Sequence, residues 1–71
     1  MSDHVYSKTE VVGSSKTSID DAIRNAIKTA GKSIRNTEWF EVSELRGHIV
    51  DGDVGHFQVT VKIGFRYEKE D

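Results

Sequence analysis

The strongest constraint on the fold is an uninterrupted alternation of apolar and polar residues over residues 56–67. The apolar members of this segment are Phe57, Val59, Val61, Ile63, Phe65 and Tyr67. A period of two residues is typical of a β-strand that buries one face. The segment therefore predicts a strand whose apolar side needs a covering layer.

A helix is predicted to supply that layer. From Ile19 to Ile34, apolar residues recur at spacings of three and four, as in an amphipathic helix. Ser18 is expected to cap its N-terminus, with two aspartates in the first turn. Alanines in the apolar stripe allow close approach to a sheet, and Gly31 indicates either a tight packing contact or a weak last turn.

Two further segments, Val5–Val12 and Trp39–Val50, are expected to form strands. Gly13 is expected to end the first strand, and residues 51–55 to form a hairpin turn after the second. A right-handed crossover through the helix makes these two strands parallel, which places the third strand between them and antiparallel to both. The prediction is an α+β fold in the order β-α-β-β, forming one domain over residues 1–71 with a solvated C-terminal tail.

The hairpin turn predicts a register in which Phe40 faces Phe65 and Val42 faces Ile63. Both pairs are expected to lie beneath the helix. The apolar positions change phase soon after Val42, which predicts a β-bulge near residues 43–44.

The same register places Trp39 beside Arg66 on the opposite face of the sheet. Leu45 and Ile49 are expected on that face too, so it is not simply polar. A mixed surface of this kind, next to open sheet edges, indicates an assembly interface.

Size and charge narrow the possible partners. The chain has 71 residues and no cysteine, so its core is small and oligomerisation is the usual remaining source of stability. The 10 basic and 12 acidic residues are interspersed, and the formal net charge of -2 predicts neither a nucleic-acid nor an anionic-membrane partner. No apolar run could span a bilayer and the first residues do not resemble a signal peptide, so a cytoplasmic protein is expected.

Trp39, the only tryptophan, has two interpretations. It is either a contact between subunits, where aromatic residues are enriched, or a stacking surface for a flat heterocycle whose edge Gln58 reads through its amide. In the predicted register Gln58 faces Gly47, about eight residues from Trp39, and at ~3.3 Å per residue this separation is too large for one ring. If both residues bind one ligand, they come from different subunits.

The remaining polar residues favour no catalytic or metal site. His48 and His56 flank the turn, but their spacing with the nearby aspartates matches no common pattern of metal ligands. No nucleophile–base motif or phosphate-binding glycine loop is recognisable, so an enzyme is not expected. Arg46 and Arg66 are consistent with a solvated or salt-bridged face, or with binding of a ligand phosphate.

Six short segments occur in an order and spacing that cover almost the whole chain. They are Val11-Val12-Gly13-Ser14-Ser15, Asp21-Ala22-Ile23, Trp39-Phe40-Glu41-Val42, Leu45-Arg46-Gly47-His48, His56-Phe57-Gln58-Val59-Thr60 and Val61-Lys62-Ile63-Gly64-Phe65-Arg66. None of them is specific alone, but together they resemble the dodecins, a family of small flavin-binding proteins.

The resemblance implies a three-stranded antiparallel sheet wrapped around one amphipathic helix, with twelve such subunits in a hollow spherical homododecamer. It also implies flavins stacked in pairs between tryptophans of different subunits, so that Trp39 is the stacking residue and Gln58 reads the pyrimidine edge. By the same resemblance, Arg46 and Arg66 would line the site, and Glu38 would bond the ribityl hydroxyls.

The implied function is storage, buffering and photochemical quenching of FMN, riboflavin or a related flavin, without turnover. Some members of the family also bind coenzyme A on the trimer axes, for which Lys32 is the candidate residue here. Two alternatives stay open: a flavin-dependent enzyme, and a purely structural or regulatory oligomer in which Trp39 is only an interface residue.

Overall fold

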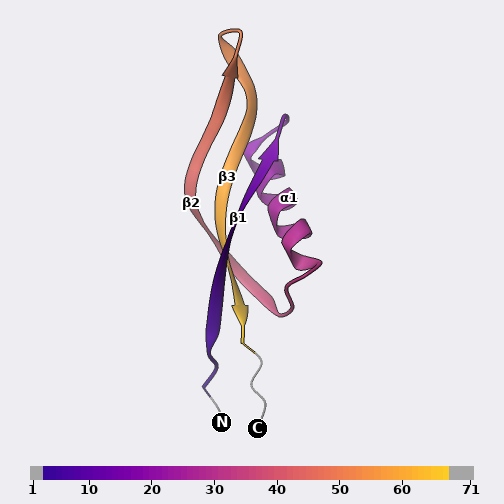
Figure 1. Cartoon of the computed structure of the whole chain (residues 1–71), viewed down its shortest axis with the longest axis vertical. Coiled ribbons are helices and arrows are strands. Elements are labelled where there is room, and N and C mark those ends of the chain that lie inside the picture. The colour runs from indigo at the N-terminus through magenta and orange to yellow at the C-terminus, as the bar shows by residue number, and fades with distance from the viewer. Residues whose placement is uncertain (1–2, 68–71) are drawn as a thin grey trace.

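The helix and the strands follow the predicted order along the chain (Figure 1). The computed structural model describes residues 3–67 and contains β1 (Tyr6–Ser15), α1 (Ile19–Gly31), β2 (Thr37–Val50) and β3 (Asp53–Arg66). The strand order is β1-β3-β2, and β3 runs antiparallel to both neighbours. The predicted α+β fold class and the central place of the third strand are therefore confirmed. The predicted solvated tail, residues 68–71, lies outside the described part.

α1 begins where the sequence predicts, because Ser18 caps it. The Ser18 hydroxyl accepts a hydrogen bond from the backbone N–H of Asp21 at 3.0 Å. The helix ends at Gly31 and stops short of Ile34. A Cβ on Gly31 would meet no atom within 4 Å, so the tight-contact interpretation is wrong and the glycine is the weak end of the helix. Within residues 3–67, no helix is long and apolar enough to cross a membrane.

The core lies where the alanine side of α1 meets β1 and β3. Its buried apolar members are Ala22, Ala26, Ala30, Val59, Val61 and Ile63. Alanine side chains keep the helix axis close to the sheet, so β-branched side chains of β3 fill most of the space between the two layers. The core is consequently small, and the four further apolar residues that pack against it are only partly buried.

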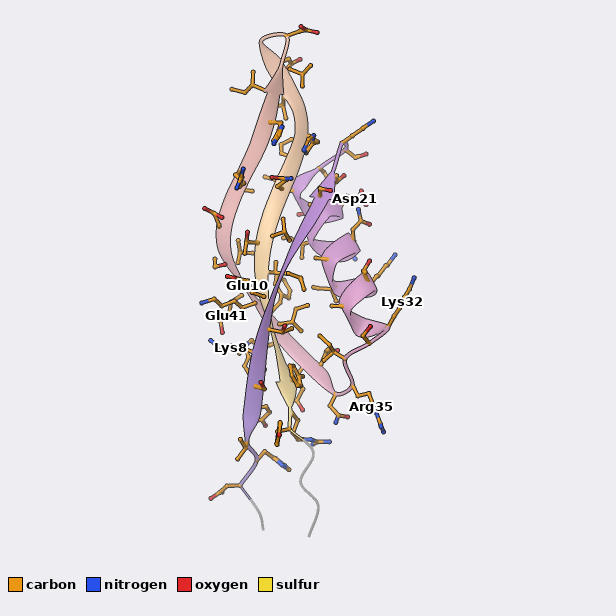
Figure 2. The ribbon with its side chains drawn as sticks, viewed as in Figure 1. Lys8, Glu10, Asp21, Lys32, Arg35 and Glu41 are labelled. Atoms are coloured by element: carbon orange, nitrogen blue, oxygen red, sulfur yellow. The ribbon has the colours of Figure 1, made fainter. Side chains whose placement is uncertain are left out.

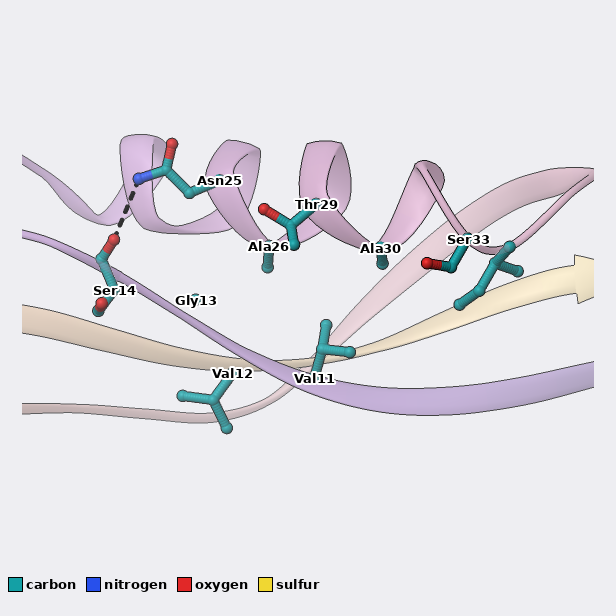
Figure 3. A pocket seen from close by; sticks show the side chains of 10 residues that line it. Val11, Val12, Gly13, Ser14, Asn25, Ala26, Thr29, Ala30 and Ser33 are labelled. Carbon is teal, nitrogen blue, oxygen red and sulfur yellow. Dashed lines mark hydrogen bonds between the residues drawn. The ribbon is translucent and has the colours of Figure 1, made fainter.

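Gly13 lies directly against α1 (Figure 3). A Cβ at this position would overlap the backbone carbonyl oxygen of Ala22 and lie 2.7 Å from the Cβ of Ala26. Beside it, the Asn25 side-chain amide donates a hydrogen bond to the carbonyl of Ser14 at 3.0 Å. β1 continues past Gly13, so the prediction that this glycine ends the strand is wrong. A glycine is required at this position because the helix packs against it, and no turn occurs there.

The turn between β2 and β3 is shorter than predicted. It consists of the Asp-Gly pair at residues 51–52, both with positive φ (52° and 77°). Two-residue turns of this kind match the right-handed twist of a hairpin. The shorter turn moves the register, so that Phe40 pairs with Ile63 and Val42 pairs with Val61, each two residues from its predicted partner.

The predicted β-bulge is present, because the register shifts after Val42. Ser43 occupies the bulge and donates a hydrogen bond from its hydroxyl to the carbonyl of Thr60 at 3.3 Å. An extra residue in one strand reverses which side chains face each side of the sheet. Leu45 therefore lies on the helix side with Val42, and the prediction that it shares a face with Trp39 is wrong.

α1 packs on β1 and β3, while the β2–β3 hairpin extends beyond it (Figure 1). A 13-residue helix is about 20 Å long, whereas the longest extent of the molecule is 56 Å. The β2 stripe, which comprises Phe40, Val42, Leu45 and Ile49, is consequently 46%, 48%, 55% and 80% exposed. The predictions that the helix covers Phe40 and Val42, and that Ile49 shares a face with Trp39, are therefore wrong.

Gly13→Ala should destabilise the fold, because the new methyl group has no room beside α1. Overpacking of this kind lowers the free energy of unfolding by about 1–3 kcal/mol. Gly31→Ala adds the same group where nothing lies within 4 Å, and should be neutral or stabilising by about 0.5–1 kcal/mol. Urea unfolding at equal protomer concentrations measures both changes. Equal stability of the two variants would contradict the packing role of Gly13.

Candidate functional site

Trp39 lies on the face of the sheet that points away from α1. It pairs with Gly64 of β3, not with the predicted Arg66, because of the shorter turn. A Cβ on Gly64 would overlap three atoms of the indole, Cε2, Cζ2 and Cδ2. The indole therefore lies over the Gly64 backbone, and Gly64 is buried although this side of the sheet has no helix. Trp39 itself remains 37% exposed.

The polar edge of the indole is hydrogen-bonded within the same chain. Its Nε1–H donates a hydrogen bond to Oε2 of Glu41 at 3.1 Å, and the Lys8 ammonium group lies 3.0 Å from the same oxygen. Tyr6 adds an edge-to-face contact, with ring centroids 5.3 Å apart at 71°. Figure 2 places Lys8 and Glu41 next to each other on the side of the sheet away from α1. Three side chains and one glycine thus hold the ring in place.

The same contacts change the acidity of Glu41. The hydrogen bond from Trp39 and then the hydrogen bond and positive charge of Lys8 lower the pKa of Glu41 below its ordinary value of 4.5. Each of these interactions favours the ionised carboxylate, which is the form that accepts the indole N–H. Glu41 is therefore charged at neutral pH.

Arg46 and Gln58 form a second group on this face. They are direct cross-strand partners, so the predicted pairing of Gln58 with Gly47 is wrong by one residue. Gln58 lies six residues along β3 from Gly64, the partner of Trp39. At ~3.3 Å per residue this separation is roughly 20 Å, too far for both side chains of one protomer to contact one ring.

Arg66 and Glu38 belong to the Trp39 end of the sheet. Arg66 follows Gly64 by two residues on β3 and pairs with Tyr6, which contacts the indole. Glu38 is exposed and sits at an irregularity in the β2–β3 register just before Trp39. The predicted site residues thus fall into two groups, one with Trp39, Glu38 and Arg66, and the other with Arg46 and Gln58.

Sequence reasoning missed the residues that hold the indole. Glu41 lies two residues after Trp39 on β2, so the alternation of strand side chains already places both on one face. Lys8 and Tyr6 carry no local signal, because they reach Trp39 only through strand pairing. Gly64 did carry one: a glycine inside a strand pattern often marks a close approach by another group.

His48 and His56 are also brought together. They are cross-strand partners, and their rings stack with centroids 4.6 Å apart at 24°. Within residues 3–67, no three His, Cys, Asp or Glu side chains are grouped so that they could hold a metal ion.

Comparison with known proteins identifies the family. A family model described as Dodecin matches residues 5–68. The dodecin of Thermus thermophilus is 43% identical over 65 residues, which cover 92% of this chain and 94% of that protein. The structure of the dodecin from Streptomyces coelicolor superposes with a TM-score of 0.92 at 50% identity, over 99% of this chain and 100% of that one. This chain belongs to the dodecin family.

Structures of single-residue variants of the Thermus thermophilus dodecin are similar as well. One variant replaces a tryptophan by phenylalanine and superposes with a TM-score of 0.89 at 40% identity, covering 94% of this chain and 100% of that one. Two others each replace an arginine by alanine, with TM-scores of 0.91 and 0.89.

The environment of Trp39 should respond to acid through Glu41. Because the pKa of Glu41 is lowered in the folded state, its stabilising contribution is fully present above pH 4.5 and is lost as the pH falls through the lower folded-state value. Near-UV circular dichroism of the only tryptophan should therefore change below pH 4.5. Glu41→Gln should remove this transition, whereas Glu38→Gln should keep it. A transition that persists in Glu41→Gln would show that another group controls the ring.

Proposed function

We propose that this protein binds flavins such as FMN or riboflavin, and that it stores and buffers them without converting them. Residues 1–71 act as one domain within a homododecamer. The observation that carries the proposal is the Trp39 indole, which rests on Gly64, donates its N–H to Glu41 and keeps 37% of its surface exposed. A fixed, half-exposed aromatic plate suits stacking with an isoalloxazine ring.

The spacing of three candidate residues supports this assignment. The tryptophan and the two arginines replaced in the Thermus thermophilus variants lie 7 and 20 residues apart in sequence order. Trp39, Arg46 and Arg66 have the same spacing here. Agreement at all three positions favours one shared site, in which the planar guanidinium groups contact the ribityl or phosphate part of the ligand.

The separation of the two groups explains why the site needs more than one subunit. Trp39 and Gln58 are roughly 20 Å apart in one protomer, so a flavin stacked on Trp39 is read by Gln58 of a different copy. The exposed β2 stripe, on the helix side of the sheet, provides a driving force for assembly as a whole, because its burial against another copy removes apolar surface from water. Oligomer and binding site then form together.

Storage fits the chemistry around the indole better than catalysis does. The carboxylate nearest the ring, Glu41, is held ionised by Trp39 and Lys8, with a pKa below 4.5. A general acid or base works best with a pKa near the operating pH, so Glu41 is poorly suited to that role.

The stacked indole also supports a protective function. An indole stacked on an excited flavin donates an electron to it and quenches its photochemistry, which protects the stored cofactor.

Removal of the stacking surface should abolish most flavin binding. Trp39→Ala should weaken FMN binding by about 5- to 150-fold, since stacking on an aromatic side chain contributes about 1–3 kcal/mol. Trp39→Phe should retain part of the affinity. Titration followed by quenching of FMN fluorescence measures both, with Tyr67→Ala as the control for loss of an exposed aromatic ring. Unchanged binding by Trp39→Ala would refute the stacking role.

Disruption of the β2 stripe should dissociate the assembly. Leu45→Lys places a charge on a surface that the proposal buries between copies, and should give species smaller than twelve subunits in size-exclusion chromatography with light scattering. Leu45→Met keeps the volume and polarity and should assemble normally. If the unsubstituted protein is monomeric at micromolar concentration, the dodecamer proposal fails.

A further inference from the structure

Gly64 interrupts an otherwise complete row of polar side chains. On the face of β3 away from α1, the alternate positions carry His56, Gln58, Thr60, Lys62, Gly64 and Arg66. Within the described residues, Gly52 is the glycine with positive φ, so backbone conformation does not require glycine at position 64. Glycine is required at position 64 because a Cβ there would overlap the Trp39 indole.

The ring is fixed on three sides. Gly64 lies beneath its plane, Glu41 accepts the hydrogen bond of its N–H, and Tyr6 packs edge-to-face against it. One ring face and the only polar atom of the side chain are thereby used inside the protomer. The indole nevertheless remains 37% exposed, so part of its surface is left for a ligand.

We propose that Gly64 is a positioning residue that sets the plane of the Trp39 indole and leaves it one face for stacking. The inference rests on the proposed flavin site and specifies what one protomer contributes to it: a single wall for a planar aromatic ligand, already oriented before binding. A ring held in this way loses little side-chain freedom when the ligand stacks on it. Because the N–H is occupied, the wall selects flat aromatic surfaces and not hydrogen-bond acceptors.

The first test observes the ring without any ligand. In Gly64→Ala, the added methyl group should displace the indole, so the near-UV circular dichroism of Trp39, the only tryptophan, should change strongly. Gly31→Ala, which adds a methyl group where nothing lies within 4 Å, should leave the spectrum unchanged. An unaltered tryptophan spectrum in Gly64→Ala would overturn the proposal, whether or not the protein binds flavin.

The second test separates a clash with the indole from general damage to β3. Gly64→Ala should lower the urea midpoint of unfolding when Trp39 is present, and should have little effect in the Trp39→Ala background, where the ring is gone. Equal shifts of the midpoint in both backgrounds would overturn the positioning role. This comparison remains informative if the single variant is poorly folded.

The third test links the ring plane to binding. Gly64→Ala should weaken FMN binding by about fivefold or more, the loss expected for a misplaced stacking surface, while Gly31→Ala should bind as the unsubstituted protein does. If the unsubstituted protein does not bind FMN, the flavin proposal fails and the first two tests still decide the role of Gly64. If it binds FMN and Gly64→Ala binds equally well, the positioning role fails alone.

Discussion

The close packing of α1 on Gly13 is the contact on which the rest of the structure depends. Alanine side chains and a glycine without a Cβ let the helix lie almost on the backbone of β1, and this fixes the helix over β1 and β3. A single short helix in that position cannot also cover β2. The protomer therefore keeps a small core and an exposed apolar stripe, which is the condition under which a chain of this length gains most from association.

The opposite face of the sheet is organised by polar contacts and not by burial. Lys8 and the Trp39 indole converge on one carboxylate oxygen of Glu41, and the glycine opposite Trp39 leaves the ring a place to lie. These groups come from three different strands, so the orientation of the ring is set by the sheet itself. Sites supported by regular elements hold their side chains more accurately than sites on loops do.

Stability and function are connected in this arrangement. The Trp39 group and the Arg46–Gln58 group occupy separate parts of one sheet face, and each is half of the site that we propose. In the proposed assembly, another copy supplies the missing half, and association also covers the β2 stripe on the other face of the sheet. Two copies in that proposed assembly thereby form a flavin site that is larger than one core of this size could enclose.

The sequence by itself determined the elements and their order, the Ser18 cap, the bulge after Val42 and the family, because each depends on local spacing. It did not determine the register, since a turn of two residues in place of five moved Phe40 and Val42 to new partners and placed Trp39 opposite Gly64. It also did not determine which side Leu45 faces, because one bulged residue reverses the alternation. Contacts such as those of Gly13 with α1, and of Tyr6 and Gly64 with Trp39, join residues distant in the chain or across strands. Only the tertiary structure, in which the exact pairing of β2 and β3 is fixed, could decide them.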